Sequence, residues 1–422
     1  MGFSLYFSIE TWTLIAIVIA LLALYGNAPY GFFKKLGIKG PKPLPFIGTF
    51  LEYRRMYSIM LQHSSNLIKS LQRKVDADEV IDVKNVFGPY SMDVVASTAF
   101  SVDIDSINRP ADPFVANIKK MTKFDLMNPW LVLIVIFPFL RPMIEKMEFS
   151  FFPADVLAFF YNFLKTIKSE RNKNNCENRV DFMQLMVDSQ ISESSKENGN
   201  NQKGLTDHEI LSQAMIFIFA GYETSSSSLC FLAYNLATHP DIQKGLQEEI
   251  DETFPDKVRP SYDDLMQMEY LDMVVNESSR LYPIANRLER VAKASVEVSG
   301  VTIPKETVVM VPIYTLHRDP SLWPEPDSFK PERFRKEKKD NIDPYAFLPF
   351  GAGPRNCIGM RFALLMMKLA LVEILQHYSF VTCKETDIPM ELGKDGFTTP
   401  KNPIKVKLEP RAAAADCTSR EI

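Results

Sequence analysis

The segment FGAGPRNCIG at residues 350–359 decides the fold of this 422-residue chain. Its glycines and its proline predict a tight loop, and the apolar run that follows predicts a helix from about Cys357 to His377. A cysteine at the turn into a helix meets amide donors and the positive end of the helix dipole, which favour a thiolate over a thiol. A thiolate is an electron-rich axial ligand for haem iron. A buried structural cysteine is the alternative, whereas a phosphate loop is excluded because neither GxGxxG nor GxxxxGK is present.

Five residues of this segment match every fixed position of the signature F-x-x-G-x-R-x-C-x-G, namely Phe350, Gly353, Arg355, Cys357 and Gly359. In this signature the chain resembles the cytochromes P-450. The resemblance implies that Cys357 ligates the iron of heme b (iron protoporphyrin IX) and that Phe350 packs against the haem near the thiolate. It further implies that Arg355 meets a haem propionate, and that Gly353 and Gly359 shape the cofactor-binding loop.

Two further motifs agree with this resemblance in order and spacing. Glu277 and Arg280 form an E-x-x-R pair on a predicted helix, where residues three apart share a face and can form an ion pair. Pro331-Glu332-Arg333-Phe334 is similar to the family's partner segment, in which Arg333 joins the pair and braces the haem loop. We interpret this triad as structural, because a desolvated and mutually satisfied charge cluster fixes geometry and performs no chemistry.

A capping box at Thr206 and Glu209 and the apolar run to Ala237 predict one helix of about 30 residues. Its centre, residues 220–225 (AGYETS), puts a glycine, an acid and hydroxyls into an apolar helix, as is expected at functional sites. A glycine that permits close helix packing, with Ser and Thr bonding back to carbonyls, is the alternative.

By resemblance, residues 220–224 are the family's oxygen-activation motif. Ala220 and Gly221 open the helix, the glycine leaving room for dioxygen. Thr224 and its neighbouring acid Glu223 then organise the water chain that delivers protons.

The amino-acid sequence around the motifs resembles one branch of the family in particular. Residues 217–224 (FIFAGYET), 268–276 (MEYLDMVVN) and 350–364 are similar to the vertebrate family 3, subfamily A enzymes, which oxidise bulky steroids and drugs. This resemblance implies NADPH-cytochrome P-450 reductase as electron donor, cytochrome b5 as a further partner and a lipophilic substrate. It implies Arg290 as a second propionate partner and a pocket lined by Ile216, Phe219, Ala220, Ile284, Ala285 and Leu288.

Composition and the N-terminal segment indicate the cellular context. The 48 basic and 52 acidic residues, net charge −4, give no basic stripe for nucleic acid, and five scattered cysteines argue against a disulfide scaffold. Residues 11–33 carry no charge and predict a single membrane span. Lysines 34, 35, 39 and 42 follow it and predict a cytosolic catalytic domain at the endoplasmic reticulum membrane. A cleaved signal peptide and a buried core helix are the alternatives.

The predicted fold is mainly α with a minor β-sheet, the cytochrome P-450 haem-thiolate fold. We expect a membrane anchor at 1–33, a proline-rich hinge at 34–57, a catalytic domain at 58–410 and a flexible tail at 411–422. Helices are expected at 240–254 and 268–281, short strands within 294–316, a surface or membrane-facing segment at 130–140 and a connection at 188–204.

The chain departs from the family pattern at a deletion junction within residues 34–57: the resemblance covers the anchor and hinge to about Leu51 and resumes at about Ser58. About eighty residues expected of the family are absent, judged by length. The resemblance implies that this block holds the N-terminal sheet and the helix B to C region, including a W-x-x-x-R motif that holds a propionate. None of the tryptophans 12, 130 and 323 is followed by Arg four residues on. Two hypotheses therefore stand: a working monooxygenase, or a truncated, haem-deficient and inactive form acting at most as a membrane-anchored interaction protein.

Overall fold

The computed structural model describes residues 9–27, 50–109, 112–121, 137, 143, 152–173, 181–191, 204–339, 341–394 and 396–411. Helices predominate and the strands are short, which confirms the predicted mainly α fold with a minor sheet. The chain forms two compact units, one of residues 1–59, 97–102 and 160–216, the other of residues 60–96, 103–159 and 217–422. The predicted hinge lies largely outside the described residues, as do most of 130–140 and 188–204 and all of the tail after residue 411.

Most of the described elements are helices, and the strands are two to six residues long. The first helices are α1 (Ile9–Asn27), α3 (Phe50–Asp76), α4 (Lys84–Phe100), α5 (Pro113–Met121), α8 (Ala154–Lys173), α9 (Phe182–Asp188), α11 (Asp207–Thr238) and α12 (Pro240–Thr253). They are followed by α13 (Tyr262–Leu265), α14 (Glu269–Leu281), α15 (Ile313–Leu316), α16 (Lys336–Lys339) and α17 (Met360–His377), with 3-10 turns η3 (Pro255–Lys257), η4 (Pro331–Phe334) and η5 (Gly353–Arg355). The strands are β1 (Ile81–Asp82), β2 (Leu288–Val291), β3 (Val296–Val298), β4 (Val301–Ile303), β5 (Val308–Val311), β6 (Tyr378–Val381) and β7 (Lys405–Pro410).

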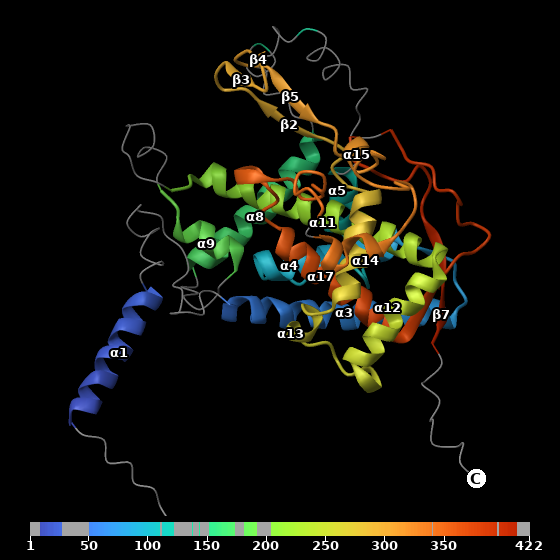
Figure 1. Ribbon diagram of the computed structural model, residues 1–422, viewed down its shortest axis with the longest axis horizontal. Helices are drawn as coiled ribbons and strands as arrows, with labels where there is room; N and C mark the ends of the chain where they lie inside the picture. Colours follow the sequence, from blue (N-terminus) through green and yellow to red (C-terminus); the bar gives the residue numbers. More distant parts are fainter. Residues whose placement is uncertain are drawn as a thin grey trace, which may run out of the picture. The chain divides into compact units, whose positions relative to one another are not determined.

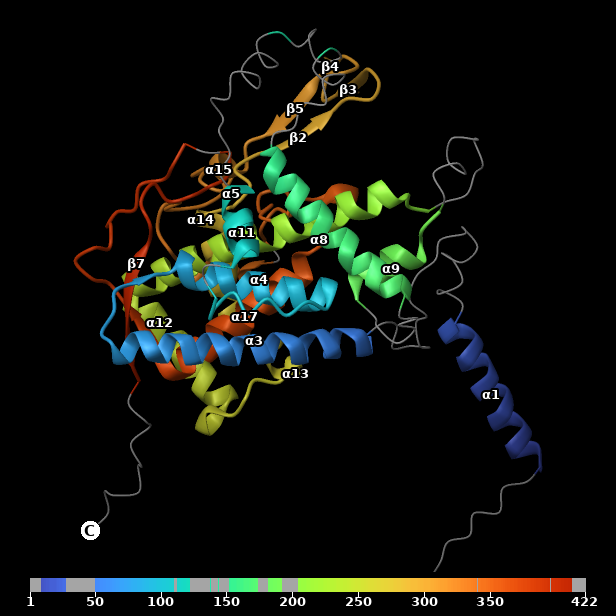
Figure 2. The same cartoon turned by 180° about the vertical axis from the view of Figure 1, so that it is seen from behind.

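The core of the larger unit surrounds α17. Residues 365–376 of this helix are buried without interruption, so it is covered on all sides. Helix α12 packs against both α14 and α17 (Figure 1). On another side α4 lies against α17, and the buried Tyr90 hydroxyl donates a hydrogen bond of 3.1 Å to the carbonyl oxygen of Met366 (Figure 2). The helix that follows the FGAGPRNCIG loop is therefore the central element of this unit.

Three small antiparallel sheets complete the larger unit. One has the order β1-β7-β6, and the others pair β2 with β5 and β3 with β4. In the β2–β5 pair, Leu288 lies opposite Val311 and Val291 opposite Val308. Every residue of β5 is exposed, as are the last three of β2. Apolar strand residues on both faces of a pair normally pack against further protein, but the part of the chain that the structure describes leaves these residues uncovered.

Most predicted boundaries agree with the structure to within a few residues. The capping box is confirmed: Glu209 Oε2 accepts from the Thr206 amide at 2.9 Å and Thr206 Oγ1 from the Glu209 amide at 3.3 Å. The expected strands within 294–316 are β3, β4 and β5, although residues 313–316 form helix α15. Helix α17 begins at Met360, three residues later than predicted, because the loop continues through Gly359.

Two apolar helices are relevant to the predicted membrane span. Helix α11 is long and apolar enough to cross a membrane, but 61% of its most apolar window is buried within the protein, as in a core helix. Helix α1 contains a shorter apolar helix, Thr11–Leu22, which lies within the predicted anchor. Most of its large apolar side chains are exposed, among them Trp12, Leu14, Ile17, Val18, Ile19, Leu21 and Leu22.

Candidate functional site

The FGAGPRNCIG loop presents Cys357 at the surface, directly before α17. Gly351 and Gly353 adopt φ of +72° and +74°, a backbone region that residues with a side chain rarely enter. The Cys357 amide donates to the Phe350 carbonyl oxygen at 2.8 Å, which closes the loop on itself. Cys357 is exposed and forms no disulfide, so the structure overturns the alternative of a buried structural cysteine. Its thiol is therefore accessible from outside the protein.

A buried ion-pair network joins the three residues predicted to brace this loop. The side chains of Glu277 and Arg280 are fully buried, and two hydrogen bonds of 2.8 and 2.9 Å connect them. Arg333 Nε approaches the same carboxylate at 3.2 Å, and the Lys330 amide donates to it at 2.8 Å. Helix α14 thereby holds the η4 segment, which lies against it.

The network extends to the loop through His317. Its Nδ1 lies 3.2 Å from the Arg280 carbonyl oxygen, and its Nε2 accepts from the Leu348 amide at 2.9 Å. The ring therefore acts as a neutral imidazole, donating from Nδ1 and accepting at Nε2. Burial is the main cause that lowers the pKa of His317 to about 4. Because Leu348 comes two residues before Phe350, the histidine ties the brace to the start of the cysteine loop.

An aromatic cluster packs behind the same segment. Trp323, Phe334 and Phe347 contact one another with ring centroids 4.7 to 6.3 Å apart. The Arg280 guanidinium lies 5.3 Å from the Trp323 ring centroid. The charge network therefore has an apolar wall, which keeps water from screening the ion pairs.

One row of residues on α11 is open although most of the helix centre is buried. Ile216 is 45% exposed, Ala220 is exposed and Thr224 is half-buried, at intervals of four residues that place them above one another. The Thr224 hydroxyl donates to the Ala220 carbonyl oxygen at 2.7 Å. Phe219, by contrast, is buried against the Phe152 and Phe397 rings. The predicted substrate residues on this helix thus divide between its open row and its packed face.

The Gly221 position has a packing role. A side-chain carbon added there would lie 2.5 Å from Cγ2 of Val95 on α4. The side of the glycine that faces α4 is therefore filled, and the dioxygen role expected of this residue stays a prediction. The structure therefore supports the alternative of close helix packing at this residue, together with the hydroxyl back-bonding seen at Thr224 and at Ser228, which donates to the Thr224 carbonyl oxygen.

Glu223 faces α4 and forms an ion pair with Lys84. The distance from Lys84 Nζ to Glu223 Oε1 is 2.9 Å, and the glutamate is only 9% exposed. Ser227 donates to the same carboxylate oxygen at 3.1 Å. Glu223 and Thr224 are neighbours in sequence, but Glu223 pairs with Lys84 of α4, whereas the Thr224 hydroxyl bonds back to Ala220 of its own helix. Sequence reasoning missed Lys84, whose partner lies 139 residues away, and also missed His317.

The remaining predicted residues lie on the strand and segment beside the loop. Ile284, Ala285 and Leu288 are half-buried. A side-chain carbon added at Gly351 would lie 3.6 Å from Leu288 Cδ1, so the start of β2 and the cysteine loop are adjacent. Arg290 on β2 and Arg355 in η5 are both exposed. An accessible thiol at a helix N-terminus, with two exposed guanidinium groups on adjacent segments, fits a ligand that carries an iron and two carboxylates.

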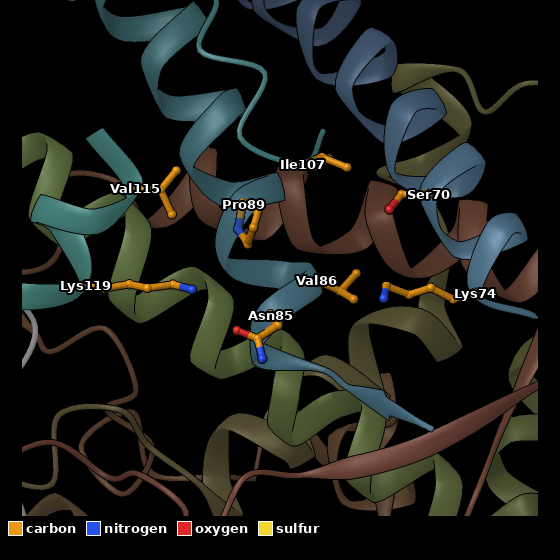
Figure 3. Close-up of a pocket in the computed structure, with 8 residues that line it drawn as sticks. All are labelled: Ser70, Lys74, Asn85, Val86, Pro89, Ile107, Val115 and Lys119. Carbon is orange, nitrogen blue, oxygen red and sulfur yellow. The ribbon is translucent and has the colours of Figure 1, made fainter. Parts of the chain in front are cut away.

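A cavity of about 220 Å³ lies apart from this loop and brace (Figure 3). Its lining comes from α3, α4, α5 and Ile107, and Figure 3 shows the Lys74 and Lys119 side chains directed toward it from opposite sides. None of the predicted site residues lines it. It is also smaller than a site for a drug-sized molecule, so it is not the predicted substrate pocket.

Comparisons with known proteins agree with this geometry. The family model Cytochrome P450 matches residues 42–408. The chain therefore belongs to the cytochrome P450 family, the haem-thiolate monooxygenases, and is an oxidoreductase of that class.

Its relatives place it further within the family. It is 53% identical to cytochrome P450 3A40 of Oryzias latipes over 504 residues, covering 98% of this chain and 100% of that protein. It is 51% identical to cytochrome P450 3A27 of Oncorhynchus mykiss over 500 residues (97% and 96%) and 47% identical to cytochrome P450 3A12 of Canis lupus familiaris over 494 residues (96% and 97%). The predicted resemblance to family 3, subfamily A is confirmed. Each alignment is longer than the 422 residues of the chain, so part of each relative has no counterpart here, as expected for an internal deletion.

Proposed function

We propose that the chain is a membrane-anchored monooxygenase that binds heme b through Cys357 and oxidises lipophilic molecules such as steroids and drugs. The observation that carries this proposal is the free, exposed Cys357 thiol on a loop whose base is held by the buried Glu277–Arg280–Arg333 network. A fully buried charge network is costly unless all its groups are paired, and this one is paired throughout. It therefore serves to fix the ligand loop.

The residues around the thiol have separable roles. Cys357 would supply the thiolate ligand, Phe350 would pack beside it, and Gly353 and Gly359 allow the loop its turns. Arg290 and Arg355 bind the two propionates by charge-assisted hydrogen bonds. Bound haem supplies the activation of dioxygen, from which one oxygen atom is inserted into a C–H bond of the substrate.

Protons for this reaction pass along the centre of α11. The half-buried Thr224 hydroxyl lies in the open row of the helix and holds the last water of the proton path. Ala220, one turn earlier, keeps that row free of a large side chain. Glu223 acts from the α4 side of the helix, where its carboxylate is ion-paired. Gly221 contributes by bringing α4 close to α11.

The substrate is apolar and large. Ile216 is exposed on α11, Phe219 packs against the Phe152 and Phe397 rings, and Ile284, Ala285 and Leu288 belong to the segment next to the cysteine loop. Such a lining offers few hydrogen bonds, so it suits lipophilic substrates held by burial of apolar surface.

Membrane and redox partners complete the proposal. The exposed apolar side chains of α1 insert into lipid and hold the catalytic domain at the cytosolic face of the endoplasmic reticulum. Electrons come from NADPH through the reductase, with cytochrome b5 as a second donor. The basic surface for these acidic partners comes from residues that precede and follow the cysteine loop in sequence, namely Lys336, Lys338, Lys339 and Arg361.

The test is a spectrum of the reduced, carbon monoxide-bound full chain. We expect the red-shifted Soret band of a thiolate ligand, and its loss in Cys357→Ala. Cys383→Ala is the matched control, because that cysteine is also free but hydrogen-bonds Thr386 away from the loop. A band that survives Cys357→Ala would show that the ligand assignment is wrong.

One observation favours the second candidate, a haem-deficient interaction protein. The apolar residues of the β2–β5 pair are exposed, Val291 by 59%, Val308 by 58% and Met310 by 52%. Uncovered apolar strands promote self-association and degradation. Absence of haem uptake by the purified chain, with the protein otherwise folded, would establish this candidate and exclude the monooxygenase.

A further inference from the structure

Helix α4 contacts the centre of α11 along one continuous face. The contacting residues Lys84, Gly88, Ser91 and Val95 are spaced by four, three and four positions, which places them on one side of a helix. A side-chain carbon at Gly88 would lie 3.0 Å from the Tyr222 hydroxyl, and the Ser91 hydroxyl donates to the Tyr222 carbonyl oxygen at 3.2 Å. Together with the contact between Val95 and Gly221 and the ion pair of Lys84 with Glu223, this face contacts three consecutive residues of the predicted oxygen-activation motif, 221–223.

Lys84 is the charged end of this face. Its ammonium group donates to Glu223 Oε1 at 2.9 Å, to Ser226 Oγ at 2.8 Å and to Ser227 Oγ at 2.9 Å. An ammonium group has three hydrogens, so all its donors are used. The Lys84 side chain is one-third exposed and that of Glu223 12% exposed, so the pair is screened far less than a surface ion pair.

The backbone fixes the position of this lysine. Lys84 is the first residue of α4, and its amide donates to Asp82 Oδ1 at 3.0 Å. Asp82 belongs to β1, which pairs with β7. The Lys84 ammonium group also lies over the Tyr222 ring, 5.5 Å from its centroid. The side chain is thus held at both ends, which lowers the entropy lost in making its three hydrogen bonds.

We propose that Lys84 is a positioning residue for proton delivery: it holds Glu223, Ser226 and Ser227 on the α4 side of α11 and so sets Thr224 apart for the open row. Residues 223–228 are polar at every position, so the helix by itself does not specify which groups face the site. A three-donor cation on one side sorts them, because each acceptor near it is stabilised only when it faces α4. This inference rests on the proposed function of Thr224 and goes beyond it by assigning a residue outside the family motifs.

Removal of the ammonium group should disturb this sorting. In Lys84→Met the nearly buried Glu223 carboxylate loses its counter-ion and turns toward other donors, of which the Thr224 hydroxyl is the nearest in sequence. Proton delivery then becomes misdirected, and more reducing equivalents leave as hydrogen peroxide. We expect the ratio of peroxide to oxidised product to rise about tenfold, less than the 10²- to 10⁴-fold contributed by a proton-transfer group itself, because Lys84 acts through Glu223.

The experiment compares Lys84→Met, Glu223→Gln, the double variant and a matched control in the full chain in lipid nanodiscs. The control is Lys74→Met. Lys74 forms an ion pair of 2.8 Å with Glu79, and both side chains of this pair are exposed. Three quantities are measured: the urea midpoint, amide hydrogen exchange of the peptide covering 220–228, and the peroxide-to-product ratio with testosterone as probe. Exchange needs no bound haem, so it tests the positioning role even if the proposed monooxygenase function fails.

We expect Lys84→Met to speed exchange in this peptide and to raise the peroxide ratio, whereas Lys74→Met changes neither. The double variant should recover the urea midpoint, since no unpaired charge remains, while exchange and the peroxide ratio stay altered. Unchanged exchange in Lys84→Met would overturn the inference. So would recovery of all three quantities in the double variant, because the pair would then contribute stability alone.

Discussion

Replacement of Arg280 by leucine should remove a large part of the stability of the larger unit. The Arg280 side chain is fully buried and makes five hydrogen bonds. Two go to Glu277, and the others go to the carbonyl oxygens of His317, Pro326 and Ser328 at 2.7, 2.8 and 3.2 Å. A leucine fills much of the same volume but satisfies none of these acceptors, so the cost comes from unpaired polar groups and not from a cavity.

The magnitude follows from what remains around Glu277. The carboxylate keeps only Arg333 Nε at 3.2 Å and the Lys330 amide at 2.8 Å. Breaking a buried pair by removing one partner costs about 3–5 kcal/mol. Since whole domains are stable by about 5–15 kcal/mol, we expect Arg280→Leu to lose about a fifth or more of the free energy of unfolding.

The assay is urea denaturation followed by circular dichroism, with Arg287→Leu as the matched control. Arg287 also pairs with a glutamate, Glu289, at 2.7 Å, but both side chains are about half exposed. Exposed pairs contribute about 0.2–1 kcal/mol, so the control should unfold close to the parent chain. An equal shift in the two variants, or a loss below about 1 kcal/mol in Arg280→Leu, would refute the reasoning that burial makes this pair important.

Two further predictions concern His317 and Gly221. Because the pKa of His317 is lowered to about 4, the unfolded chain takes up a proton near pH 6.5 while the folded chain does not. The free energy of unfolding should therefore fall between about pH 6.5 and pH 4, and His317→Gln should show a smaller slope in urea titrations over this window; an identical slope would contradict the assignment. Gly221→Ala gains about 1 kcal/mol of helix propensity but overpacks against Val95, at a cost of about 1–3 kcal/mol. We expect a lower urea midpoint that Val95→Ala restores in the double variant, and a midpoint above that of the parent chain would contradict the packing role.

The sequence predicts the parts of this fold that depend on local pattern. The capping box at Thr206 specifies the start of α11, because both of its hydrogen bonds connect residues three apart. The Glu277–Arg280 pair is predictable for the same reason, since one helical turn brings the two side chains together. The start of α17 was less predictable, because the left-handed glycines at 351 and 353 set the exit direction of the loop.

Contacts between distant segments could not be predicted in this way. Nothing in the neighbourhood of Lys84 indicates that its ammonium group reaches Glu223, because the partner depends on how α4 lies across α11. The same holds for His317, which is an ordinary histidine in sequence and gains its role from Arg280 and Leu348. The packing of Gly221 could not be predicted for the same reason: Val95, which it contacts, is 126 positions away in the chain.

Haem binding would place two requirements on this fold, one on the thiolate side and one on the propionate side. The ligand side depends on Cys357, Arg280 and His317, all within residues 217–411, where Arg280 bonds to the His317 carbonyl oxygen and His317 to the Leu348 amide. The propionate side depends on Arg290, whose strand β2 pairs only with β5 among the described strands and is exposed. A short two-stranded sheet is marginally stable without a packed face, so Arg290 is held less firmly than Cys357. If haem binds, the spectrum should therefore report a normal thiolate ligand even where affinity is low, because the two properties are set by different parts of the fold.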